Sequence, residues 1–208
     1  MPTVSKEELV EGFRIQTIQE AALRVISRRG LAAATMQEIA DEAGLAKGTL
    51  YLYFENRDEL VVHVVAEAFQ ELLRAMAESL GRPGTAARRL EAALLTHVEF
   101  FESRRALFRL FLAVAHPGPF PQRTARHARA CNPLYLAYLD LLTSFFSEAQ
   151  ARGEVRPLRP DRLALFVAEG LSGVVLRRLG ETDPPPVQED VRLVVDALVG
   201  GITDRRTP

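Results

Sequence analysis

Apolar residues recur at three- and four-residue spacing along most of the chain, and this periodicity predicts helices instead of strands. The clearest case begins after the cap Asn56 and carries apolar side chains along one face to about Leu80. Segments rich in glycine and proline interrupt the periodicity at 81–84, 116–121 and 180–186. Further helices are expected from Thr85, over 103–115, from about 123 or 131 to 152, over 161–179 and over 187–202. The pattern therefore predicts an all-α fold.

Two short helices joined by a tight turn are predicted between Thr35 and Phe54. Thr35 and Glu38 form a Thr-x-x-Glu capping box, in which each side chain can bond the backbone N–H of the other residue. Gly44 suits the end of the first helix, because glycine adopts a positive φ without steric penalty. In the second helix, Leu50 and Phe54 are four residues apart and should both face the core. Two helices joined in this way are typical of the helix-turn-helix that lays its second helix in the DNA major groove.

The second short helix, over about 46–54, leaves a lysine, a threonine and two tyrosines for its open face. Lysine and tyrosine can donate to phosphate oxygens, and threonine can contact a base edge or a thymine methyl. Gly48 lacks a side chain where a DNA backbone could approach closely. The predicted DNA-binding residues are Thr35, Lys47, Gly48, Thr49, Tyr51, Tyr53 and Arg57.

At these positions the sequence resembles the tetracycline-repressor (TetR) family of bacterial transcription regulators. The resemblance covers about Phe13 to Leu60, from FRIQTIQEAALRVISRRG through AKGTLYLYF to ENRDEL. It implies an all-helical homodimer that contacts DNA through residues such as Lys47 and Tyr53, and a variable C-terminal domain that usually binds a small effector. The expected function is a repressor that occupies a pseudo-palindromic operator and is released when the effector binds.

The chain is predicted to form two domains, a helix-turn-helix DNA-binding domain over 1–57 and a helical effector-binding and dimerisation domain over 58–208. A length of 208 residues allows both to fold around cores. Charge is unusual for a nucleic-acid binder, because the net charge is −1 and residues 1–57 carry seven Lys and Arg against eight Asp and Glu. The positive groups must therefore be arranged on the surface that faces DNA, since they are not abundant.

The larger domain holds nine aromatic residues between Phe100 and Phe146, in a chain without tryptophan. Aromatic residues at helical spacing usually form only core, but this density would also suit a lipophilic pocket. The nearby arginines either form a solvated surface or bind an anionic ligand head such as a coenzyme A phosphate. The predicted effector site comprises Phe101, Arg105, Phe108, Arg109, Phe111, Arg123, Arg126, Arg129, Tyr135, Tyr138 and Phe145. The expected effector is a small lipophilic compound, for example an acyl-coenzyme A.

The last two predicted helices are apolar over more than one face, which indicates burial on several sides. Gly170 and Gly173 lie inside the first of them, where each costs about 1 kcal/mol relative to alanine. Close approach of another helix would offset that cost. Packing within one subunit and a four-helix dimer interface both explain the pattern. The predicted dimer interface comprises Phe166, Gly170, Gly173, Val174, Val191, Val195 and Leu198.

Enzymatic chemistry is not predicted. The four histidines show no metal-ligand spacing, and no phosphate loop or nucleophile motif is present, so neither a metal nor a cofactor is expected. The polar N-terminus does not resemble a signal peptide and no apolar run could span a bilayer, so a cytoplasmic location is expected. The single cysteine, Cys131, excludes an intramolecular disulfide. The alternative function is a helical ligand-binding or protein-interaction module that does not bind DNA.

Overall fold

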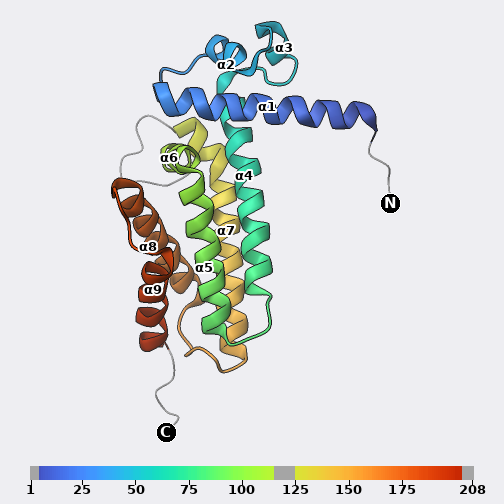
Figure 1. Cartoon of the computed structure of the whole chain (residues 1–208). Coiled ribbons are helices and arrows are strands. Elements are labelled where there is room, and N and C mark those ends of the chain that lie inside the picture. Colours follow the sequence, from blue (N-terminus) through green and yellow to red (C-terminus); the bar gives the residue numbers. More distant parts are fainter. Residues whose placement is uncertain (1–4, 115–124, 203–208) are drawn as a thin grey trace. The chain divides into compact units, whose positions relative to one another are not determined.

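The computed structural model describes residues 5–114 and 125–202, with their side chains except at 6–7, 113–114, 125–132 and 199–202. Over these ranges the protein is helical and has no strand, which confirms the all-α prediction (Figure 1). The helices are α1 (Lys6–Arg29), α2 (Met36–Ala43), α3 (Lys47–Tyr51), α4 (Arg57–Leu80), α5 (Ala86–Ser103), α6 (Arg105–Val114), α7 (Ala125–Ala151), α8 (Pro160–Gly180) and α9 (Val187–Ile202). The proline-rich segment at 116–121 and Phe120 lie outside the described residues.

Helix α1 begins well before the Phe13 at which the sequence resemblance starts. Ser5 caps it with a second capping box, in which the Ser5 hydroxyl accepts from the Glu8 N–H at 3.1 Å. The Glu8 carboxylate in turn accepts from the Ser5 N–H at 2.6 Å. Residues 8–13 of α1 are all exposed, including the apolar Leu9 and Phe13. This part of the helix therefore has no buried face that the sequence pattern could reveal.

The chain forms two compact units. The N-terminal unit contains Met1–Glu67 and Ala106–Cys131, and the C-terminal unit contains Ala68–Arg105 and Asn132–Pro208. The domain boundary predicted after residue 57 coincides with the start of α4. Since α4 continues without interruption to Leu80, the division between the units falls inside that helix.

In the N-terminal unit, α2 packs against both α1 and α3. Ile18 of α1, Ile39 of α2, Leu50 of α3 and Leu60 of α4 are all fully buried in the core of this unit. Polar contacts add to this packing, since the Gln19 amide nitrogen lies 2.9 Å from Nδ1 of His63. The short helix α3 is therefore held on a scaffold of longer helices.

In the C-terminal unit, α5 packs against α8 and α9. A buried arginine joins these three helices, because Arg178 of α8 pairs with Glu102 of α5 at 2.9 Å and with Asp190 of α9 at 2.5 Å. Its guanidinium also donates to the Pro185 carbonyl at 2.8 Å. Because these ion pairs connect Arg178 to two other helices, Arg178 holds α8 and α9 on α5. Truncating it would leave the carboxylates of Glu102 and Asp190 without their partner cation.

Candidate DNA interface and effector site

The turn between α2 and α3 has the geometry that its sequence predicts. The Thr35 hydroxyl accepts from the Glu38 N–H at 3.2 Å, and the Glu38 carboxylate accepts from the Thr35 N–H at 3.1 Å. Gly44 ends α2 in the left-handed region with φ 67° and ψ 30°. The following N–H, of Leu45, donates back to the Ala40 carbonyl at 2.9 Å. These bonds satisfy backbone groups at both ends of α2 and fix the direction in which α3 leaves it.

Helix α3 presents its polar side chains and buries its apolar one. Leu50 is fully buried, and Phe54 just after the helix is nearly so, as their four-residue spacing predicts. Lys47 and Tyr51 are exposed and Thr49 is half-buried. The Lys47 ammonium lies 5.9 Å from the centre of the Tyr51 ring, within range of a cation–π interaction. A Cβ at Gly48 would meet no other atom within 4 Å, so the surface around this glycine is open.

Two further predicted DNA contacts are engaged within the unit. The half-buried Tyr53 accepts from Arg14 of α1 at 3.4 Å through its hydroxyl. Arg57 donates to the carbonyls of the loop between α1 and α2, at 3.1 Å to Leu31, 3.2 Å to Ala32 and 3.0 Å to Ala34. Its guanidinium therefore holds that loop to the start of α4. This role was not predicted.

The arginines near the end of α1 are paired with acidic residues of α2. Arg24 and Arg28 reach the Glu42 carboxylate at 2.7 and 2.5 Å, and Arg29 reaches Glu38 at 2.8 Å. Hydrogen bonds from Arg28 and then Arg24 hold the pKa of Glu42 below its usual value. The acidic residues that lower the net charge of this unit thus serve to join α1 to α2, while Lys47 extends from the exposed face of α3.

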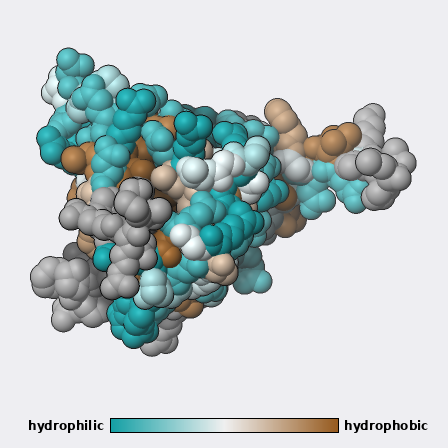
Figure 2. All heavy atoms as spheres, turned by 90° about the horizontal axis from the view of Figure 1, so that it is seen from below, coloured by the Kyte–Doolittle hydropathy of each residue, from teal (hydrophilic) through white to brown (hydrophobic). Residues whose placement is uncertain are grey.

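The N-terminal unit also has an apolar hollow beside α1. Its volume is about 440 Å³, and Leu9, Val10 and Phe13 of α1 form its wall together with Ala43 and Leu45. Figure 2 shows hydrophobic residues along the exposed N-terminal turns of α1. Phe13 is 71% exposed, although aromatic residues usually form core.

The predicted effector residues divide between the two units. Phe101, Tyr135, Tyr138 and Phe145 are buried in the C-terminal unit. Phe108 and Phe111 are buried in the N-terminal unit, with ring centres 6.3 Å apart. Arg105 and Arg109 are exposed, and the side chains of Arg123, Arg126 and Arg129 lie outside those that the structure describes. Four of the predicted aromatic residues therefore belong to the core of one unit, the C-terminal unit.

The aromatic core of the C-terminal unit contains a histidine that lacks a full set of partners. His97 of α5 is buried, and its ring centre lies 5.1 Å from that of Phe101. Its Nδ1 lies 3.2 Å from the Tyr138 hydroxyl, whereas Nε2 has no hydrogen-bond partner. Burial lowers the pKa of His97 to about 3, so the imidazole is neutral at pH 7.

A second polar pair lies next to this histidine. Tyr135 donates to the Glu169 carboxylate of α8 at 2.5 Å, and its ring centre lies 6.5 Å from that of Tyr138. Burial and the neighbouring carboxylate raise the pKa of Tyr135, so its hydroxyl stays protonated. One signal in the sequence could have identified His97, because it follows Leu94 by three residues and precedes Phe101 by four on the buried face of α5.

The predicted dimer residues also separate by burial. Phe166, Gly170 and Gly173 of α8 are exposed on one side of the helix, and Val174 is half-buried. Val191, Val195 and Leu198 of α9 are instead buried within the single subunit, in a helix that packs on α5. Leu176 of α8 and Leu193 of α9, which were not predicted, are 57% and 70% exposed.

Two kinds of site have no support in the described part of the chain. No group of three His, Cys, Asp or Glu side chains there is arranged to hold a metal ion. None of the helices over the described ranges is long and apolar enough to cross a membrane.

Known proteins match both the sequence and the fold. The family model for bacterial regulatory proteins of the tetR family matches residues 18–64. The chain is 26% identical to the fatty acid metabolism regulator protein of Bacillus subtilis (strain 168) over 147 residues, 71% of this chain and 73% of that protein. It is 25% identical to the HTH-type transcriptional regulator BetI of Brucella anthropi over 202 residues, 95% of this chain and 96% of that protein.

The fold extends the similarity to the C-terminal unit. The transcriptional regulator FadR of Bacillus subtilis, solved in complex with stearoyl-CoA, aligns with a TM-score of 0.80 at 22% identity. The alignment covers 90% of this chain and 98% of that chain. The ketosteroid transcriptional regulator KstR2 of Mycobacterium tuberculosis aligns with a TM-score of 0.70 at 21% identity, covering 92% of this chain and 96% of that one. The fold of these regulators is therefore shared along nearly the whole chain.

Proposed function

Because this chain carries the DNA-binding domain of the tetR family of bacterial regulatory proteins, we propose that it is a transcriptional repressor that a lipophilic effector releases from its operator. The observation that carries this proposal is the helix α3, which buries Leu50 and leaves Lys47, Thr49 and Tyr51 on the surface of a capped helix-turn-helix. This arrangement suits a helix that enters the major groove. Lys47 and Tyr51 would contact phosphates, and Thr49 would contact a base edge.

A homodimer provides the second helix-turn-helix that a pseudo-palindromic operator requires. The proposed interface lies on α8 and α9, where Phe166 and Leu176 of α8 and Leu193 of α9 are exposed in the single subunit. A Cβ at Gly170 or Gly173 would meet no atom within 4 Å, so neither glycine is needed for packing inside the subunit. Both would instead allow the partner's helices to approach closely. The four-helix interface would use these residues in place of Val191, Val195 and Leu198, which are already buried.

The proposed effector is an acyl-coenzyme A whose acyl part enters the aromatic core of the C-terminal unit. The names of two relatives support this class, since one regulates fatty acid metabolism and one was solved with stearoyl-CoA. Within the core, Nε2 of His97 is a buried polar atom without a partner, next to Phe101 and Tyr138. If the Tyr138 hydroxyl donates to Nδ1, Nε2 carries the proton and would donate to the thioester carbonyl.

The arginines that the sequence predicts for the effector site would bind the other end of the effector. Arg105, Arg109, Arg123, Arg126 and Arg129 are the proposed partners of the coenzyme A phosphates, because a guanidinium can bind phosphate oxygens in pairs. Binding would favour a conformation in which the two recognition helices no longer match the operator half-sites.

Operator release by acyl-coenzyme A tests the proposal directly. The operator would first be selected from random DNA by the purified protein, and binding followed by fluorescence anisotropy as salt is varied. Acyl-coenzyme A of increasing chain length should release the DNA, while free coenzyme A should not. In the Arg123, Arg126, Arg129 triple alanine variant, release should need a higher concentration. Release by the free fatty acid alone, unchanged in that variant, would assign the arginines to the solvated surface. Absence of any linear dependence of log K on log salt would contradict DNA binding itself.

A further inference from the structure

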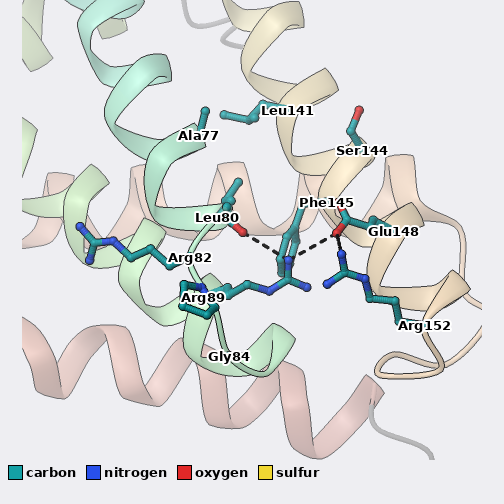
Figure 3. A pocket seen from close by; sticks show the side chains of 12 residues that line it. Ala77, Leu80, Arg82, Gly84, Arg89, Leu141, Ser144, Phe145, Glu148 and Arg152 are labelled. Carbon is teal, nitrogen blue, oxygen red and sulfur yellow. Dashed lines mark hydrogen bonds and ion pairs between the residues drawn. The ribbon is translucent and has the colours of Figure 1, made fainter.

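A cavity of about 480 Å³ lies in the C-terminal unit, away from the residues assigned to the effector except for Phe145. Its walls come from the end of α4, the turn at 81–84, Arg89 of α5 and the last turns of α7 (Figure 3). The side chains of Arg89 and Glu148 point toward one another across it. Arg89 lines this cavity, and Arg89 and Arg178 are the two buried cations in the described part of this unit.

Arg89 is only 5% exposed, yet its hydrogen bonding is incomplete. One terminal nitrogen, Nη1, donates to the Leu80 carbonyl at 3.3 Å and lies 3.5 Å from the Glu148 carboxylate. The other, Nη2, lies 3.6 Å from Glu154, and neither Nη2 nor Nε has a hydrogen-bond partner. The guanidinium packs 5.2 Å from the centre of the Phe145 ring. A buried guanidinium normally has its N–H groups satisfied, so this one lacks an acceptor.

The charges around the cavity favour an anion. Three arginines line it, Arg82, Arg89 and Arg152, against one carboxylate, that of Glu148, while Glu154 pairs with Arg89 from outside the lining. Glu148 lies closer to Arg152, at 2.5 Å, than to Arg89 at 3.5 Å. An entering anion could therefore accept from the unpartnered Nε and Nη2 of Arg89 and displace Glu148 from Nη1, while Glu148 keeps its pairing with Arg152.

An apolar surface leads away from this cation. A second hollow of about 400 Å³ shares Ala77, Leu141 and Ser144 with the cavity and continues between α4 and α7 past Leu73 and Ala137. Arg74 and Asp140 complete its mainly apolar lining. The two hollows together thus place a cationic end and an apolar stretch in a single groove.

We propose that this groove binds an amphiphilic anion, with a carboxylate or phosphate head at Arg89 and an alkyl chain along Ala77 and Leu141. The assignment does not depend on the proposed repressor function, because the groove lies wholly in the C-terminal unit and needs no DNA. The site is separate from His97, which does not line either hollow.

Calorimetric titration of the 208-residue chain with four probes tests the chemistry of the site. Decanoate and decyl phosphate should bind saturably, and the tighter of the two identifies the head group. Decanol should bind at least about tenfold more weakly, because it lacks the charge-assisted hydrogen bonds. Inorganic phosphate should also bind more weakly than decyl phosphate, since it lacks the chain. No saturable binding of either amphiphilic anion, or equal binding of decanol and decanoate, would overturn the proposal.

Substitutions in the groove locate the binding. Glu148→Gln should strengthen decanoate binding severalfold, because it removes the carboxylate that competes for Arg89. This sign is informative, since a purely structural Arg89 gives no reason for a gain. Ala77→Phe should weaken binding about tenfold or more by filling the groove, and Glu78→Phe is the matched control on the exposed surface of the same helix.

Arg89→Lys keeps the charge but removes the planar fork, so it should weaken binding about tenfold. Thermal melts of each variant would show whether it is folded. If Arg89→Lys does not fold, Glu148→Gln and Ala77→Phe still decide whether the groove binds the anion. Wild-type decanoate affinity in Ala77→Phe, or weaker binding in Glu148→Gln, would overturn the site. Binding that is lost in His97→Gln but kept in Ala77→Phe would place the ligand in the aromatic core.

Discussion

Lys47 and Arg57 are both cations beside the recognition helix, but the structure gives them different environments. Lys47 is exposed at the start of α3. Arg57 donates to three loop carbonyls more than twenty residues earlier in the chain. Sequence spacing predicted both as DNA contacts, because local patterns show which way a side chain faces and not which distant backbone it reaches.

Alanine substitutions should separate these two roles. Lys47→Ala should leave the free energy of unfolding nearly unchanged and reduce the slope of log K against log salt by about 0.9 for each phosphate that the lysine neutralises. Arg57→Ala should instead lower the free energy of unfolding by about 1–3 kcal/mol, because part-buried carbonyls no longer have their donor. Urea denaturation and anisotropy measure the two quantities. An equal decrease in stability in both variants would contradict the distinction.

His97 should make stability depend on pH. Above its unfolded pKa of about 6.5, the histidine is neutral in both states and contributes no pH dependence. Below that value the unfolded chain takes up a proton, while the folded protein does not until about pH 3. Stability therefore falls as the pH falls through this window.

Between pH 7 and pH 5, wild-type protein should lose about 2 kcal/mol more stability than His97→Gln. Urea denaturation at each pH measures the difference, and His63→Gln serves as the control because His63 is exposed. The same slope in wild type and His97→Gln would show that His97 takes up a proton in the folded state.

At the scale of elements, local rules predicted most of the helix-turn-helix. The cap at Thr35, the stop at Gly44 and the inward face of Leu50 all follow from spacing within a few residues. The pairing of His97 with Tyr138 spans 41 residues, and no local pattern contains it. In α9 the apolar arc is so wide that the sequence could not show which side packs on α5, and the predicted interface residues Val191, Val195 and Leu198 are the inward ones.

Gly44 offers a test of the turn itself. Gly44→Ala should lower the free energy of unfolding by about 1 kcal/mol, because alanine is strained at a φ of 67° even though its Cβ would meet no atom within 4 Å. Gly44→Asn should cost less, since asparagine tolerates the left-handed region. Urea denaturation of the two variants gives the comparison. An equal cost for both substitutions would point to altered packing around the turn in place of backbone strain.

At the scale of the whole molecule, the exposed apolar residues of α8 and α9 predict the assembly. Phe166→Glu should shift the protein toward a monomer of 23.1 kDa in light scattering and weaken operator binding, with the helix-turn-helix unaltered. Leu136→Glu is the matched control, because Leu136 of α7 is also exposed but lies outside the proposed interface. A Phe166→Glu variant that stays dimeric at micromolar concentration would exclude this face of α8.

The scarcity of lysine gives the exposed position of Lys47 a practical consequence. The chain has 24 arginines and only two lysines, Lys6 near the start of α1 and Lys47 at the start of α3. Apart from the chain's terminal amine, amine-reactive dyes and coupling resins can therefore attach only at these two side chains. A label introduced in this way, or a surface that captures the protein through its amines, would occupy the helix proposed to enter the DNA groove. Probes for binding experiments are better attached at an engineered cysteine in the C-terminal unit, with Cys131 replaced by serine so that the thiol label attaches at one position.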